Sequence, residues 1–200
     1  MKQIIVIHGG DTFETHEEYL SFLKSFEIDF ERFKSGRKDW KVTLSEELGE
    51  GFEVILPSMP SKTNAKYIEW KIWFEKLIPF FKDSVIFVGH SLGAIFLAKY
   101  LSENEFPKKI AATFLVAGPY DDKDFEESLA DFVLPEDLEK LVGQGGKIYL
   151  YHSKDDPVVP FADLEKYKKS LPSAEVRIFE DREHFSQVDF PELVEDIKGL

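Results

Sequence analysis

The stretch VIFVGHSLGAIFLAKYL, residues 85–101, changes its pattern at a Gly-His-Ser-Leu-Gly break. Before the break, the continuous apolar run SVIFV predicts a strand that is covered on both faces. After it, apolar residues recur at helical spacing from Leu92 to Tyr100. Gly89-His90-Ser91-Leu92-Gly93 is therefore a G-x-S-x-G sequence between a strand and a helix. Such a turn forces its serine into a strained conformation and presents the hydroxyl above the sheet, at a helix N-terminus.

Other apolar segments place this strand in a larger sheet. Because the inner ones are continuously apolar rather than alternating, they favour a parallel sheet, and the amphipathic stretches between them favour an alternating α/β fold. We expect a three-layer sandwich of about six mostly parallel strands with helices on both faces. The predicted strands are residues 3–7, 52–56, 84–89, 111–117, 147–152 and 175–180.

The chain is predicted to be a single domain over residues 1–200, since it contains no repeat, low-complexity tract or linker. Residues 14–48 are predicted to form a helical insertion of two helices, broken near Ser35-Gly36. Residues 119–145 are rich in acidic side chains, which favours a solvated helical face; a small lid over a site is the alternative interpretation, and the two are compatible. A further helix is expected after Asn64 as its cap, with Ile68, Ile72 and residues 74–77 on its apolar face and Pro79 at its end.

Composition excludes several classes of function. The 200 residues contain 38 acidic and 25 basic side chains, a net charge of -13 that repels nucleic acid and anionic membranes. The absence of cysteine excludes disulfides, thiolate metal sites and a cysteine nucleophile. No apolar run approaches the length of a membrane span, and the N-terminus lacks a signal-peptide pattern. We expect a cytoplasmic protein with no cofactor and no metal.

A serine nucleophile needs a base, and the chain offers acids and a histidine in the order Ser, Asp, His. Asp155 and Asp156 follow the predicted strand 147–152, and His184 follows the strand 175–180. Because carboxyl ends of parallel strands share one edge of a sheet, these residues are expected to meet Ser91 there. Either aspartate can be the acid at this point.

Four other histidines are less suited to be the base. His90 adjoins the serine and is expected to point to the other side of the turn. His152 lies at its strand and is expected to pack or to hold a loop, and His16 is expected at the surface. His8 is expected to shape the loop after the first strand. A metal site of His8, His90, Asp156 and His184 is not expected, because no metal-ligand spacing supports it.

Nearly the whole chain resembles the α/β-hydrolases, and in particular the small single-domain serine hydrolases of the retinoblastoma-binding-protein type. The resemblance depends on four motifs: His8-Gly9-Gly10, Gly89-His90-Ser91-Leu92-Gly93, Asp156-Pro157-Val158-Val159-Pro160 and His184-Phe185. It implies a catalytic triad of Ser91, Asp156 and His184, with Asp155 as the alternative acid. It also implies an oxyanion hole made by the backbone N–H groups of Leu92 and Gly10, with Asp11 as the alternative to Gly10.

The predicted function is that of a serine hydrolase, similar to a carboxylesterase, which cleaves small carboxylic esters through an acyl-enzyme. One alternative is an amidase or peptidase that uses the same triad. The other is a protein-binding module on a hydrolase fold, because a fold does not determine a function. The expected partner is a small-molecule ester or amide substrate; a protein partner is possible but not indicated.

Overall fold

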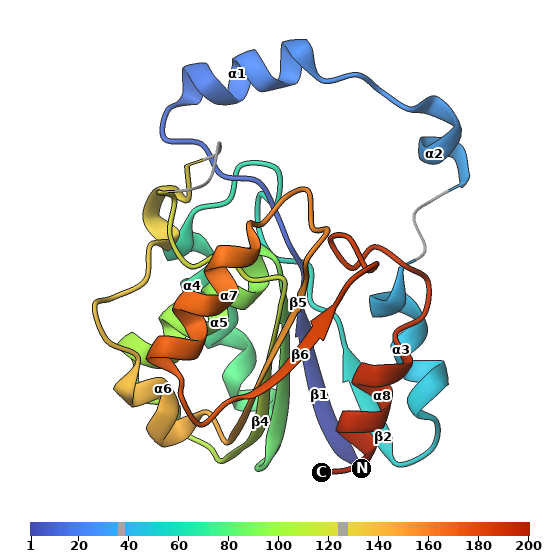
Figure 1. Ribbon diagram of the computed structural model, residues 1–200, viewed down its shortest axis with the longest axis vertical. Coiled ribbons are helices and arrows are strands. Elements are labelled where there is room, and N and C mark those ends of the chain that lie inside the picture. Colours follow the sequence, from blue (N-terminus) through green and yellow to red (C-terminus); the bar gives the residue numbers. More distant parts are fainter. Residues whose placement is uncertain (36–38, 124–127) are drawn as a thin grey trace.

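The computed structural model describes residues 1–35, 39–123 and 128–200. In these residues, six strands form one entirely parallel sheet with the order β2-β1-β3-β4-β5-β6 (Figure 1). Each predicted strand is confirmed to within one residue at either end. The strands are β1 (Lys2–Ile7), β2 (Phe52–Ile55), β3 (Val85–His90), β4 (Ile110–Val116), β5 (Lys147–Ser153) and β6 (Glu175–Phe179).

The central strands are continuously apolar because their alternate side chains enter two different cores. In β1, Ile5 and Ile7 belong to one buried cluster and Ile4 and Val6 to the other, and all four are fully buried. The same division holds along β3. A strand covered on both faces has no solvent side that would require polar residues.

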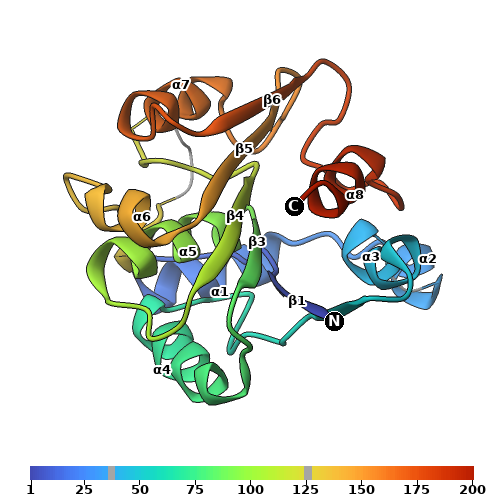
Figure 2. The same ribbon diagram turned by 90° about the horizontal axis from the view of Figure 1, so that it is seen from below.

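Helices cover both faces of the sheet, so the fold is the three-layer α/β sandwich that was predicted (Figure 2). On one face lie α3 (Trp40–Leu48) and α8 (Pro191–Lys198), which pack against each other and on the second cluster. The other face carries α4 (Tyr67–Leu77), the short helix η1 (Ile78–Phe80), α5 (Leu92–Glu103), η2 (Ala130–Phe132), α6 (Glu139–Gln144) and α7 (Phe161–Ser170).

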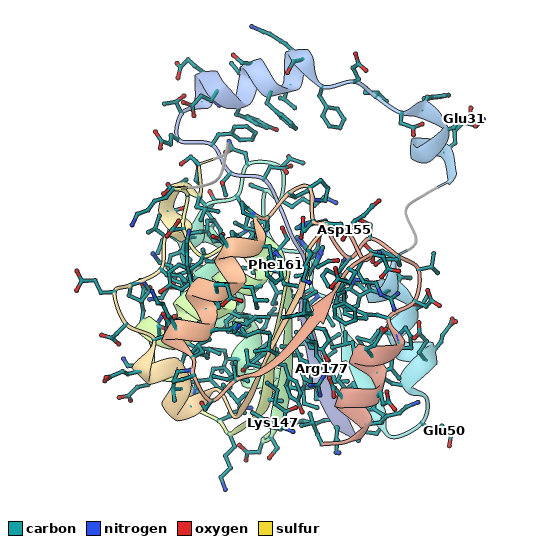
Figure 3. The ribbon with its side chains drawn as sticks, viewed as in Figure 1. Glu31, Glu50, Lys147, Asp155, Phe161 and Arg177 are labelled. Atoms are coloured by element: carbon teal, nitrogen blue, oxygen red, sulfur yellow. The ribbon has the colours of Figure 1, made fainter. Side chains whose placement is uncertain are left out.

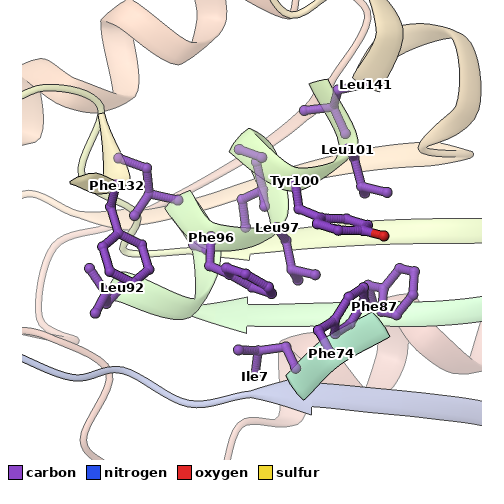
Figure 4. Close-up of a cluster of buried hydrophobic side chains, with 14 of the residues drawn as sticks. Ile7, Phe74, Phe87, Leu92, Phe96, Leu97, Tyr100, Leu101, Phe132 and Leu141 are labelled. Carbon is purple, nitrogen blue, oxygen red and sulfur yellow. The ribbon is translucent and has the colours of Figure 1, made fainter. Parts of the chain in front are cut away.

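The larger of the two buried clusters lies on the face of the sheet that carries α4 and α5 (Figure 4). Aromatic rings fill it edge to face: Phe74 contacts Phe96 with ring centroids 5.4 Å apart and Tyr100 at 4.9 Å. Such pairs stabilise beyond their buried area by about 0.5–1.5 kcal/mol each. Helix α5, which begins directly after Ser91, is therefore held rigidly beneath the turn that it follows.

Two expectations about α4 are wrong. The helix begins at Tyr67 rather than after Asn64, because Asn64 lies in a turn and donates its N–H to the Ser61 carbonyl. The Tyr67 N–H donates instead to the Asp131 carboxylate, from a distant segment. The buried face consists of Tyr67, Trp70 and Phe74, whereas the predicted Ile68 and Ile72 are half exposed.

The expectation of two helices in residues 14–48 is also wrong. Its described residues form three: α1 (His16–Ser25), α2 (Phe30–Ser35) and α3. The break predicted near Ser35-Gly36 falls partly on residues outside the described ranges. Helix α1 buries none of its side chains and lies with α2 beyond the carboxyl edge of the sheet (Figure 1). Helix α3, by contrast, is part of the core, because it buries Trp40, Leu44 and Leu48 on the sheet.

The described residues of the segment 119–145 are tied to the core. Leu129, Phe132, Leu138 and Leu141 are buried in the larger cluster. Residues 124–127, within the predicted lid, lie outside the described ranges. Among the described residues, no helix has both the length and the apolar character that crossing a membrane requires.

Because the strands are all parallel, their carboxyl ends lie together at one edge of the sheet. Figure 3 shows this for β5: Lys147, at the start of the strand, lies at one end of the sheet, and Asp155, just past its last residue, lies at the other. The order β2-β1-β3 places a topological switch point between β1 and β3, where crossovers leave in opposite directions. Ligands bind at such points in open parallel sheets.

Candidate active site

Ser91 occupies a strained turn between β3 and α5. Its backbone has φ 55° and ψ -123°, a conformation that side-chain-bearing residues rarely adopt. Two hydrogen bonds hold it there: the Ser91 N–H donates to the Val116 carbonyl at 2.9 Å, and its carbonyl accepts from the Ala94 N–H at 2.8 Å. Strain of this kind persists only where the surroundings over-determine it, and it clusters at functional sites.

The two glycines of the turn are needed for different reasons. A Cβ atom on Gly89 would lie 2.5 Å from the Gly93 carbonyl oxygen, so these two positions do crowd each other. A Cβ on Gly93 would instead lie 2.2 Å from the carbonyl oxygen of Ile7, in β1. Glycine at 93 thus lets the start of α5 approach the neighbouring strand. The loop after β1 is equally close, since a Cβ on Gly9 would lie 3.4 Å from Ser91 Oγ.

The strain at Ser91 leads to a stability prediction. Because glycine adopts positive φ without a Cβ penalty, Ser91→Gly should unfold with a free energy about 1 kcal/mol higher than Ser91→Ala. Urea denaturation of the two variants measures the difference. Equal stability, or a more stable alanine variant, would show that the turn stores no strain.

The acid and the histidine come together at the ends of β5 and β6. His184 Nδ1 lies 2.9 Å from Asp156 Oδ2 and 3.1 Å from Oδ1. The Asp156 side chain is fully buried, and its Oδ1 also accepts the N–H groups of Val158 and Val159 at 2.8 and 3.0 Å. Since a carboxylate only accepts, Nδ1 of His184 carries the proton and Nε2 is left as the basic nitrogen.

Asp155 has a different position. Its Oδ1 accepts hydrogen bonds from the Ser153 hydroxyl and from the Glu183 N–H, the latter at 2.9 Å. It therefore joins the loop after β5 to the loop that carries His184. Of the two candidate acids, Asp156 contacts the imidazole and Asp155 braces the loops.

Ser91 and His184 line one cavity of about 540 Å³, above the β1–β3 switch point. Within the described residues no hydrogen bond joins the Ser91 hydroxyl to the imidazole; in ligand-free enzymes such bonds are often long and tighten with substrate. Burial raises the pKa of Asp11 in this cavity, and the nearby Lys62 counteracts that shift. Other residues that line the cavity are Gly9, Gly10, Leu56, Leu92, Leu129 and Val158.

Backbone donors are available beside the serine. Leu92 begins α5, so its N–H has no partner within the helix. In the described part of the chain, neither this group nor the Gly10 N–H donates to any acceptor, and both residues line the cavity. Asp11, the predicted alternative to Gly10, is unsuitable because its N–H donates to the Lys62 carbonyl at 2.8 Å.

His8 fixes the glycine loop. Its Nε2 accepts the Met59 N–H at 2.9 Å, so its proton lies on Nδ1, 2.6 Å from the Gly9 carbonyl oxygen. Burial lowers the pKa of His8, mainly by removing the imidazole from water. A neutral His8 thus anchors the loop that carries Gly9 and Gly10, which agrees with the role expected for it from the sequence.

His152 holds the loop that carries Asp156. It is 1% exposed, and its Nε2–H donates to the Val159 carbonyl at 3.0 Å. Burial is the main cause that lowers the pKa of His152. His16, in contrast, lies on the exposed first turn of α1.

The lowered pKa of His152 predicts loss of stability in acid. Below about pH 6.5 the unfolded chain binds a proton here that the folded chain does not, so stability falls as pH decreases, by up to about 1.4 kcal/mol per unit. Denaturation at pH 7.5, 6.5 and 5.5 should give a shallower pH dependence for His152→Gln than for the wild type. His16→Gln is the matched control and should keep the wild-type slope. An unchanged slope in His152→Gln would contradict the account.

Part of the site was not predicted from the sequence, and the expected position of His90 is wrong. Rather than pointing away, His90 lines the cavity, and its Nε2 lies 2.8 Å from the His184 carbonyl oxygen. Asp39 and Lys41, from the start of α3, also line the cavity and were not predicted. No motif marks them in the sequence. In the described ranges, no group of three or more His, Cys, Asp or Glu side chains could hold a metal ion.

The sheet is open and parallel, a strained serine follows β3, an acid follows β5 and a histidine follows β6. This arrangement defines the α/β-hydrolase fold. Comparison with known proteins agrees. The chain belongs to the serine hydrolase family, whose sequence model matches residues 33–188. The matched range leaves out β1 and His8-Gly9-Gly10.

Particular relatives support both the family and the fold. The chain is 28% identical over 152 residues to Serine hydrolase RBBP9 of Rattus norvegicus. The aligned region covers 75% of this chain and 78% of that protein. It shares its fold with the ydeN gene product of B. subtilis, with a TM-score of 0.73, 18% identity and coverage of 100% and 98%. A Nitrososphaera gargenis structure has a TM-score of 0.61, 16% identity and coverage of 99% and 89%.

Proposed function

We propose that this serine hydrolase cleaves small carboxylic esters through an acyl-enzyme, with Ser91 as nucleophile, His184 as base and Asp156 as the acid that orients it. One observation carries the proposal. A serine in a strained strand–helix turn lines the same cavity as an imidazole whose Nδ1–H is donated to a fully buried carboxylate. This arrangement leaves Nε2 to take the serine proton.

The proposed reaction has two halves. Ser91 Oγ bonds to the ester carbonyl carbon while His184 Nε2 takes the hydroxyl proton, and the oxyanion accepts from the N–H groups of Leu92 and Gly10. The C–O bond then breaks, and the imidazolium protonates the departing alcohol. Water next attacks the acyl-enzyme with the same base, which releases the carboxylic acid and restores the serine. Asp156 stabilises the imidazolium in both halves.

The cavity favours small substrates. Its volume of about 540 Å³ lies within the range of small-molecule sites. Leu56, Leu92, Leu129 and Val158 give it apolar walls suited to an acyl group. We propose esters rather than amides as the substrates, and the Nitrososphaera gargenis neighbour, which is described as a carboxylesterase, supports this choice.

The test is a panel of substrates with graded acyl length. Wild-type protein is assayed on p-nitrophenyl acetate, butyrate, octanoate and palmitate, and on the anilides of the two shortest acids. We expect kcat/KM to be highest at acetate or butyrate, to fall for the longer chains, and to be at least about a hundredfold lower for the anilides. Faster anilide cleavage would favour an amidase. No turnover of any substrate would favour a binding protein on this fold.

A further inference from the structure

A buried ion pair next to the cavity has no role in the proposed triad. Lys41 Nζ lies 2.8 Å from Asp39 Oδ2, and the two side chains are only 9% and 11% exposed. Both come from the first residues of α3, where Asp39 also caps the helix by accepting the Lys41 N–H. Burying charged groups is costly, so such a pair calls for a reason.

The pair contacts the loop of His184 through His90. Lys41 Nζ lies 3.5 Å from His90 Nδ1, and an ammonium group can only donate. His90 Nδ1 is then the acceptor and its proton lies on Nε2, which donates to the main-chain carbonyl of His184 at 2.8 Å. The His90 and His184 rings lie with their centroids 5.0 Å apart.

The loop that receives this contact is itself strained. Glu183 and Phe185, on either side of His184, both have positive φ, at 46° and 52°. Neither residue is glycine, so the loop keeps its shape only because its surroundings hold it. The neighbour of Lys41 contributes to this, since the Trp40 indole donates to the Phe185 carbonyl at 2.9 Å.

We propose that Lys41 is a positioning residue for His184: it fixes His90 as the Nε2–H tautomer, and His90 then holds the carbonyl of His184 in its strained loop. The residue directly before Ser91 thereby sets the position of the base that serves Ser91. The effect of Lys41 on catalysis rests on the proposed function. The tautomer of His90 and the contacts that join Lys41, His90 and His184 do not depend on it.

The kinetic test uses variants that separate positioning from folding and from substrate binding. Lys41→Met should lower kcat by about tenfold or more and change KM less than about twofold, because a displaced base slows the chemical step rather than binding. Since this variant leaves Asp39 without the Lys41 ammonium, Asp39→Asn/Lys41→Met is made as well. Asparagine keeps the helix cap, and the double variant carries no buried carboxylate at this position.

His90 variants test the route. His90→Leu should lose as much kcat as Lys41→Met, and the combined variant should lose no more than either alone. His90→Gln should recover most of the activity, because its amide can accept from Lys41 and donate to His184. Lys82→Met removes a lysine from a surface pair with Glu53 at 2.6 Å and should leave kcat unchanged.

Nitrogen NMR of the histidines gives a readout that does not need turnover. We expect the Nε2–H tautomer of His90 in wild type and loss of that single tautomer in Lys41→Met. The proposal is overturned if folded Asp39→Asn/Lys41→Met keeps wild-type kcat, if the Lys41 and His90 losses add, if only KM rises, or if wild-type His90 carries its proton on Nδ1. Inactive wild-type protein with the expected tautomer would count against the proposed function and leave the positioning contact supported.

Discussion

Ser91→Ala is expected to lose about 10⁴–10⁶-fold in kcat toward the ester that the wild type cleaves best. Without the hydroxyl no acyl-enzyme forms, and the remaining activity comes from binding and the oxyanion donors alone. KM should change little, because the serine contributes little to ground-state binding. Steady-state assays on the purified variant measure both values.

The control for this variant is a second serine, which lies near the far end of the helix that follows Ser91. Ser102 lies in α5 and donates its hydroxyl to the Ala98 carbonyl, far along the helix from the cavity. Ser102→Ala should keep kcat within about twofold of wild type, as expected for a substitution away from the reacting atoms. Ester turnover that persists in Ser91→Ala would mean that another group is the nucleophile.

Asp156→Asn is expected to lower kcat by about 10⁴-fold. The carboxylate fixes the proton of His184 on Nδ1, and an amide in its place can donate to Nδ1 and force the proton to Nε2. An imidazole in that tautomer cannot accept the serine proton. The loss should appear in kcat measured at saturating ester.

Asp155→Asn is the matched comparison, because it makes the same change one residue away. Asp155 braces two loops and does not contact the imidazole, so we expect a small loss in unfolding free energy and a kcat within about tenfold of wild type. If Asp155→Asn were the inactive variant and Asp156→Asn the active one, the assignment of the acid would be reversed.

Most of the fold could be predicted from the sequence because the strands carry a strong signal. Runs such as residues 4–7 and 85–88 are apolar at every position, which only a doubly covered strand requires. Helix faces were harder. Ile68 and Ile72 are as apolar as Trp70 and Phe74, and only the position of the sheet decides which of them are buried.

The segment 14–48 shows a second limit. Its aromatic residues follow a helical period, yet α1 buries none of them, and α3 alone packs on the sheet. A periodic pattern predicts a helix but not the surface that the helix meets. The start of α3 depends on the Asp39 cap and on burial of Trp40, neither of which the period indicates.

For the site, the order of residues predicted Ser91 and His184 and left two aspartates as candidate acids, of which the family resemblance implied Asp156. Contacts between distant segments could not be foreseen. Asp155 and Asp156 are adjacent and chemically identical, and the fold alone places one of them against the imidazole. Lys41 is 49 residues from His90 and belongs to no motif. Contacts of this kind depend on how α3 docks beside the loop after β6.

The central claim is that the Ser91 hydroxyl is activated by His184, and covalent labelling tests it most directly. Wild-type protein is treated with a fluorophosphonate, and the adduct is located by intact mass and peptide mapping. We expect one adduct per chain, on Ser91, and labelling that is at least about a hundredfold slower in His184→Ala. An adduct on another residue, or Ser91 labelling that does not depend on His184, would contradict the account.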